Sequence, residues 1–102
     1  MSITVETRRK AADHLFRLSA LATVPESARI YDEDTHQINF DRVRDWRWSS
    51  GEEVLVDALL FILDFGPKSP TLRDIFYGVD AENRAVILEA IRILNGYEPT
   101  WT

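Results

Sequence analysis

The chain has 102 residues, of which 45% are hydrophobic, 28% are charged and none is cysteine. This composition is typical of a soluble globular protein, and we expect a single domain over residues 1–102. Without cysteine, the chain forms neither a disulfide framework nor a thiolate zinc site. The first residues do not resemble a secretory signal, and the longest hydrophobic run is shorter than the roughly 20 residues that cross a bilayer. We therefore expect a cytoplasmic protein without membrane contact.

The net charge of −5 lies in the second half of the chain. Residues 1–48 carry eight basic and eight acidic side chains, whereas residues 49–102 carry four basic and nine acidic ones. Binding to nucleic acids depends on cations that neutralise phosphates. The acidic half therefore disfavours nucleic-acid binding.

The first predicted element is a helix that begins after Thr4, whose side chain can cap it, and ends before Pro25. Its apolar positions recur at helical spacing: Ala11, Ala12, Leu15, Phe16, Leu18, Leu21 and Ala22. Residues 28–40 form the best strand candidate, in which Ile38 and Phe40 alternate with polar residues to make a β-hairpin. An isolated hairpin is marginally stable, so it must pack on the helices or pair with another chain.

A short helical turn is predicted at residues 41–47, carrying Val43 and Trp46 inward. The next segment, residues 52–65, is apolar on nearly all sides, which predicts a central helix covered from several directions. Its narrow polar stripe consists of three acidic residues: Glu53, Asp57 and Asp64. We expect an aspartate at Leu59 or Phe61 to unfold the domain.

The second half contains clear helix boundaries. Ser49 or Ser50 begins a Ser-x-x-Glu capping box in either of two registers, and Gly66 ends the central helix. Ser69 and Pro70 predict the start of a short helix over residues 71–77. That helix is predicted to offer three residues to the core: Leu72, Ile75 and Phe76.

The last predicted helix begins at Asp80, a capping residue, and ends at Gly96. Its apolar face consists of Val86, Ile87, Ala90, Ile91 and Leu94. The predicted fold is therefore α+β and mainly helical: an N-terminal helix, one β-hairpin and a three-helix unit around a buried central helix.

The sequence contains no phosphate-binding loop and no arrangement typical of a catalytic triad. Residues 32–36 gather two aspartates, a glutamate and His36, but they lack the length, glycine and distal glutamate of a calcium loop. We therefore expect no enzymatic activity, no catalytic residue, no metal and no cofactor.

The candidate interface residues are three tryptophans and one arginine: Trp46, Arg47, Trp48 and Trp101. Arginines and aromatics over residues 42–48 are typical of a platform for single-stranded nucleic acid, and equally of cation–π pairs within one chain. Trp101 lies in the terminal segment, where an aromatic residue indicates a contact with the core or with another subunit.

The three predicted helices of the second half also invite a helix-turn-helix interpretation, in which the last helix enters the DNA groove. Only Asn83 and Arg84 near its start suit that role. A pattern over residues 48–96, beginning Trp48-Ser-Ser-Gly-Glu52 and ending at Gly96, is similar to short uncharacterised proteins of actinobacterial genomes and their phages. The resemblance implies a shared helical unit and no activity, cofactor or site.

The sequence favours a non-enzymatic protein-interaction module that self-associates. Its partner is another protein or a second copy of the same chain. The alternative is a nucleic-acid-associated regulatory protein built on the helix-turn-helix-like unit.

Overall fold

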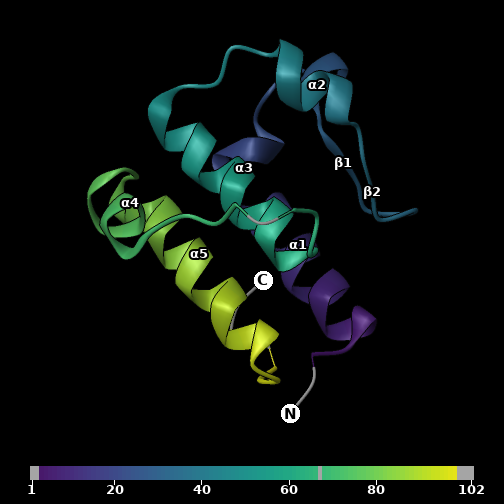
Figure 1. Cartoon of the computed structure of the whole chain (residues 1–102), viewed down its shortest axis with the longest axis vertical. Helices are drawn as coiled ribbons and strands as arrows, with labels where there is room; N and C mark the ends of the chain where they lie inside the picture. The colour runs from purple at the N-terminus through teal and green to yellow at the C-terminus, as the bar shows by residue number, and fades with distance from the viewer. Residues whose placement is uncertain (1–2, 67, 99–102) are drawn as a thin grey trace.

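The computed structural model describes residues 3–66 and 68–98 and contains five α-helices and one short hairpin in that part of the chain (Figure 1). The elements are α1 (Val5–Leu18), β1 (Tyr31–Asp32), β2 (Gln37–Ile38), α2 (Phe40–Asp45), α3 (Ser50–Ile62), α4 (Leu72–Tyr77) and α5 (Ala81–Leu94), with 3₁₀ turns at Ala20–Ala22 and Glu26–Ala28. The predicted α+β, mainly helical fold is confirmed. No helix of the described residues is long and apolar enough to span a membrane.

The core forms where α1 and α5 lie along one another and α3 packs against both (Figure 1). Six residues of α3 are buried: Val54, Leu55, Val56, Ala58, Leu59 and Ile62. The central position predicted for this helix is thus confirmed, but Phe61 is 47% exposed. The expectation that Phe61 is a core residue is wrong: Phe61 lies two positions after the buried Leu59, about 200° around the helix, and therefore faces away from the core.

Helix boundaries follow local capping chemistry. The Thr4 side chain accepts a hydrogen bond from the backbone N–H of Thr7, and the Asp80 side chain accepts one from the backbone N–H of Asn83. Both residues therefore cap their helices, as predicted. The Ser49 hydroxyl accepts from the N–H of Glu52 at 3.1 Å, while the Glu52 carboxylate accepts from the N–H of Ser49 at 2.9 Å. These reciprocal bonds decide between the two capping-box registers.

The cap of α4 differs from the prediction. The helix begins after Thr71, whose hydroxyl accepts from the N–H of Asp74, and Ser69 and Pro70 lie outside it. The N–H of Thr71 donates to the Asp74 carboxylate at 3.0 Å, and these bonds hold the pKa of Asp74 below its usual value. A full capping box competes better for the helix start than a serine followed by proline.

The hairpin is shorter than predicted. Tyr31 pairs with Ile38 and Asp32 with Gln37, in antiparallel register. Phe40 does not continue β2, because Asn39 caps α2 at that point, and the Phe40 side chain is 51% exposed.

Candidate interaction surfaces

The predicted Trp46–Arg47–Trp48 segment lies between α2 and α3. The two indole rings meet edge to face, with centroids 6.3 Å apart. The Trp48 indole N–H donates to the carbonyl of Val43 at 2.9 Å, and its half-buried ring packs against the core. Trp46 and Arg47 are exposed, so the prediction that Trp46 points inward is wrong: the chain leaves α2 in an extended conformation there, and Trp48 takes the inner position. Trp101 lies outside the described residues.

Among the described residues, the two most exposed large hydrophobic side chains, Tyr77 and Leu72, lie on α4. Leu72 is 74% exposed, Phe76 46% and Tyr77 82%, and only Ile75 of this helix is buried. The prediction that Leu72 and Phe76 face the core is therefore wrong. A six-residue helix meets its neighbours along one line, so Ile75 alone reaches the core.

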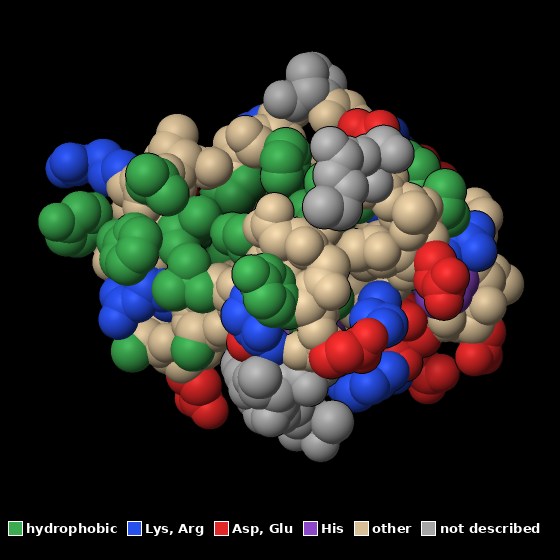
Figure 2. Space-filling model, turned by 90° about the horizontal axis from the view of Figure 1, so that it is seen from below, with side chains coloured by type: hydrophobic (Ala, Val, Ile, Leu, Met, Phe, Trp, Pro, Cys, Tyr) green, Lys and Arg blue, Asp and Glu red, His purple; other side chains and the backbone are tan. Residues whose placement is uncertain are grey.

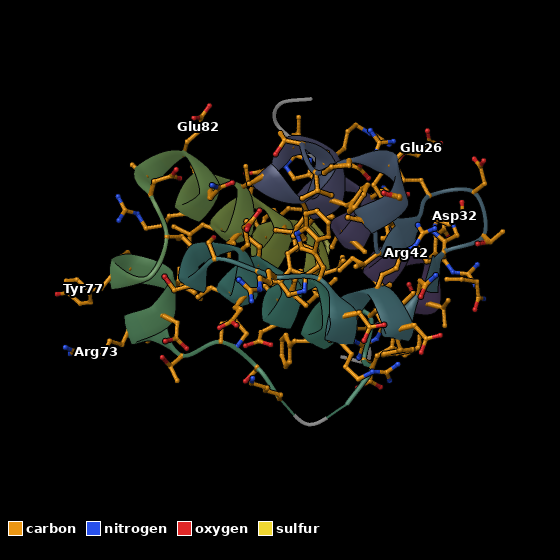
Figure 3. The ribbon with its side chains drawn as sticks, turned by 90° about the horizontal axis from the view of Figure 1, so that it is seen from above. Glu26, Asp32, Arg42, Arg73, Tyr77 and Glu82 are labelled. Atoms are coloured by element: carbon orange, nitrogen blue, oxygen red, sulfur yellow. The ribbon has the colours of Figure 1, made fainter. Side chains whose placement is uncertain are left out.

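Two arginines complete this surface. The Arg73 guanidinium lies over the Tyr77 ring at 5.5 Å, and the Arg84 guanidinium lies over the Phe76 ring at 5.7 Å. Arg84 also donates to the carbonyl of Phe76 at 3.2 Å. Figure 3 shows Arg73 and Tyr77 projecting together from one end of the molecule.

In Figure 2, hydrophobic side chains gather over the end where α4 lies, with basic side chains on both sides of them. We call the five residues Leu72, Arg73, Phe76, Tyr77 and Arg84 the α4 surface. Contiguous exposed apolar patches of this kind mark interaction sites on small proteins. The sequence already contained an indication of this surface: the predicted helix has fewer than two turns but several large apolar residues, and so short a helix cannot bury all of them.

A second exposed aromatic group lies at the start of α2 and the end of α3. The rings of Phe40 and Phe65 meet edge to face at 5.8 Å, and Phe61 lies in the last turn of α3, which ends at Ile62. These side chains are 42–51% exposed. We call Phe40, Phe61 and Phe65 the Phe surface.

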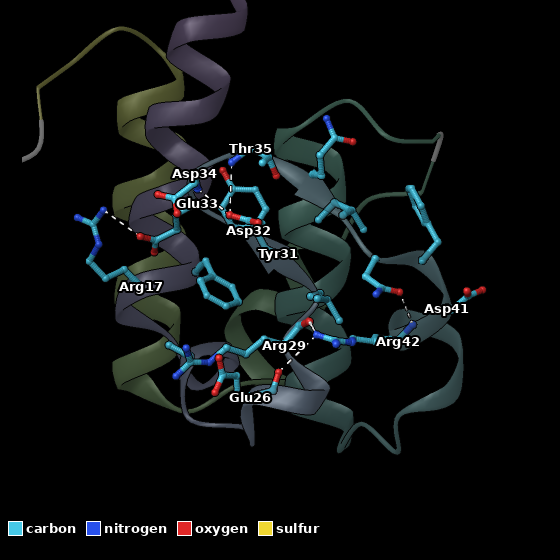
Figure 4. Close-up of a pocket in the computed structure, with 17 residues that line it drawn as sticks. Arg17, Glu26, Arg29, Tyr31, Asp32, Glu33, Asp34, Thr35, Asp41 and Arg42 are labelled. Atoms are coloured by element: carbon cyan, nitrogen blue, oxygen red, sulfur yellow. Dashed lines mark hydrogen bonds and ion pairs between the residues drawn. The ribbon is translucent and has the colours of Figure 1, made fainter.

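An open cleft of about 1040 Å³ lies between the hairpin, α2 and the C-terminal end of α1 (Figure 4). Two of the arginines that line it have partners within the chain. Arg42 donates to the carbonyls of Arg29 and Glu26, at 2.8 and 3.4 Å, and Arg17 pairs with Glu33 at 3.5 Å. These arginines therefore hold the cleft walls together rather than presenting a charge to a ligand.

The acidic turn of the hairpin also has a structural role. The Asp32 carboxylate accepts hydrogen bonds from the N–H groups of Asp34 and Thr35. The His36 ring is directed elsewhere: its Nδ1 lies 2.8 Å from the Tyr31 hydroxyl, which donates to Asp13 at 2.6 Å. Burial, followed by the hydrogen bond to Asp13, raises the pKa of Tyr31. Among residues 3–66 and 68–98, no three potential ligands gather as a metal site.

The helix-turn-helix alternative depends on α5, which lies in the core along α1. Its two candidate recognition residues have partners within the chain. Asn83 accepts a hydrogen bond from the N–H of Ala20 at 3.0 Å, and Arg84 stacks on Phe76. Nothing in this packing favours insertion of α5 into a DNA groove.

Comparison with known proteins adds no relative. The resemblance of residues 48–96 to short actinobacterial and phage-type proteins stays a prediction. No family model, no curated protein and no solved structure matches the chain.

Proposed function

We propose that this chain is a non-enzymatic protein-interaction module of the cytoplasm that associates with copies of itself through the α4 surface. The observation that carries the proposal is the exposure of Leu72, Phe76 and Tyr77 on one short helix. The fold uses only Ile75 of that helix for its core, so core packing does not account for the other three hydrophobic residues.

The residue types of the α4 surface support the same function. Tyrosine and arginine are enriched among the residues that dominate interface energies. Each guanidinium lies against an aromatic ring, which orients it before any partner arrives and reduces the entropy lost on binding. By contrast, Trp48 is held by the carbonyl of Val43 and by the core. We therefore place the contact at the α4 surface, while Trp46, Arg47, Trp48 and Trp101 stay predicted interface residues.

The test is sedimentation velocity of the full chain over a range of concentrations, comparing wild type with Leu72→Glu. Leu72 is the first residue of a capped helix, where a glutamate suits the helix dipole, so the variant keeps its fold. We expect the wild-type chain to gain mass with concentration, and we expect the association of the variant to be weakened about tenfold or more, as for loss of an interface anchor.

Val5→Glu is the matched control. Val5 is also an exposed aliphatic residue at the first position of a helix capped by threonine, and the charge change is the same. It should associate like wild type. A wild-type chain that stays monomeric at high micromolar concentration would overturn the proposed function.

A further inference from the structure

The α4 surface and the Phe surface lie on different elements, which are separated in the fold. In Figure 1, α4 is at the left, while α2, which begins at Phe40, is at the upper right. Figure 3 shows the same separation from above, with Tyr77 and Arg73 at one end and Arg42 of α2 near the other. A second copy of the chain docked on one of these surfaces therefore leaves the other surface free.

The α4 surface carries positive charge. Within the described residues, neither Arg73 nor Arg84 forms an ion pair with a carboxylate, and both guanidiniums lie over the exposed rings. An acidic surface with aromatic faces complements it best, because each guanidinium can then meet both a carboxylate and a ring.

The Phe surface has this complementary character. Asp64 lies in the sequence between Phe61 and Phe65 and is exposed, and it forms no ion pair within the part of the chain described. Asp64 follows the end of α3 at Ile62, and Glu53 and Asp57 lie on the helix itself, nearer its N-terminus.

The neighbouring cations are already engaged. Lys68 pairs with Asp57 at 3.6 Å, and Arg8 donates to the carbonyl of Ile62 at 3.0 Å. At the start of α2, Asp41 pairs with Arg44 at 2.7 Å. The Phe surface thus combines three exposed rings with acidic groups, and Asp64 is its available carboxylate.

We propose that the α4 surface of one copy docks on the Phe surface of the next, so that the self-association is head to tail. This inference rests on the proposed function and names the occupant of its binding surface. Pairing two α4 surfaces would bring four guanidiniums together, and pairing two Phe surfaces would oppose their carboxylates. The head-to-tail contact instead sets Arg73 and Arg84 against Asp64 and the Phe rings.

A head-to-tail contact between two different surfaces of a subunit leaves one surface of each kind unused at the ends of an open assembly. It therefore grows into a closed ring or an open chain of subunits, rather than stopping at a two-fold dimer. This difference makes the arrangement testable by mixing variants.

The experiment uses Leu72→Glu, which damages the α4 surface, and Phe61→Gln, which damages the Phe surface at an exposed position. Circular dichroism and thermal unfolding first confirm that both variants are folded. Sedimentation velocity then measures each variant alone and the equimolar mixture, at a concentration where wild type assembles. Val5→Glu again serves as the control with unchanged assembly.

Head-to-tail docking predicts that each variant alone is monomeric, with association weakened about tenfold or more. The mixture should form a one-to-one heterodimer and nothing larger, because each partner contributes its one intact surface. A Phe61→Gln variant that still dimerises would show two α4 surfaces in contact, which overturns the head-to-tail arrangement and keeps the proposed function. If both variants assemble like wild type, the contact lies elsewhere on the molecule. If the wild-type chain is monomeric, it does not self-associate. Either result overturns the proposed function together with this inference.

Discussion

His14 lies on the buried face of α1, with 6% of its surface exposed. Burial lowers the pKa of His14, because the imidazolium loses hydration in the core. The nearby charge of Glu89 on α5 opposes this shift, and that of Arg17, one turn along α1, adds to it. A histidine on an apolar helix face thus makes stability depend on pH without belonging to any site.

The pH dependence has a definite sign. Since the folded-state pKa of His14 is below the usual value of 6.5, the unfolded chain binds this proton more readily. The free energy of unfolding should therefore decrease as the pH falls from about 7.5 to about 5.5, across the usual histidine pKa. Urea unfolding at several pH values measures this slope.

His14→Gln should flatten the slope in that window, because glutamine does not titrate. His36→Gln keeps His14 and should retain its contribution to the slope. An unchanged slope in His14→Gln would contradict the assignment of the effect to this residue.

At the level of elements, the helices are set by short-range bonds, and α3 shows this most clearly. Two registers of its capping box were open from the sequence, starting at Ser49 or at Ser50. The structure forms the first, in which Ser49 and Glu52 exchange two bonds, while Ser50 becomes the first residue of the helix. The side chain of an adjacent serine thus provides a control within the same turn.

Ser49→Ala should lower the free energy of unfolding by about 1 kcal/mol, because the N–H of Glu52 loses its acceptor. For a domain of this size, that change corresponds to a decrease in melting temperature of about 4–8 °C. Ser50→Ala should change stability by no more than about 0.5 kcal/mol, as for an exposed helical position. Equal losses in the two variants would contradict the assigned register.

At the level of the whole molecule, α3 supplies both the centre of the core and one exposed aromatic group. Leu59 has no exposed surface, whereas Phe61, two residues later, is 47% exposed. The expectation that an aspartate at either position unfolds the domain therefore no longer applies to Phe61, and the difference leads to a paired experiment.

Leu59→Asp should unfold the chain, because an unpaired buried carboxylate costs several kcal/mol, comparable with the total stability of such a domain. Phe61→Asp should stay folded, because water hydrates the new carboxylate. Circular dichroism and thermal unfolding distinguish the two outcomes. An unfolded Phe61→Asp variant would show that this side chain supports the core.

Chelator should leave the melting temperature unchanged. The carboxylate of Asp32 accepts bonds from its own turn, and the ring of His36 is directed at Tyr31, so neither supports a bound ion. Thermal unfolding with and without chelator measures the effect. A decrease of several degrees would assign a metal to the hairpin turn.

The sequence by itself determined the helix starts at Thr4 and Asp80 and the turn at Gly96, where φ is +98°. These features depend on hydrogen bonds and backbone conformations within a few residues, so local residue types are sufficient. The predicted end of the central helix at Gly66 is wrong, because α3 ends at Ile62 and the chain turns at Leu63 and Asp64 before it reaches that glycine.

Only the tertiary structure decided which apolar residues are covered. Helical spacing marks Leu72, Ile75 and Phe76 as one face, but the contact of α4 with the rest of the fold reaches Ile75 alone. For the same reason the sequence favoured the tryptophans as the interface, whereas the structure anchors Trp48 and exposes α4. Burial depends on distant elements that meet in space, and a pattern within one segment does not contain that information.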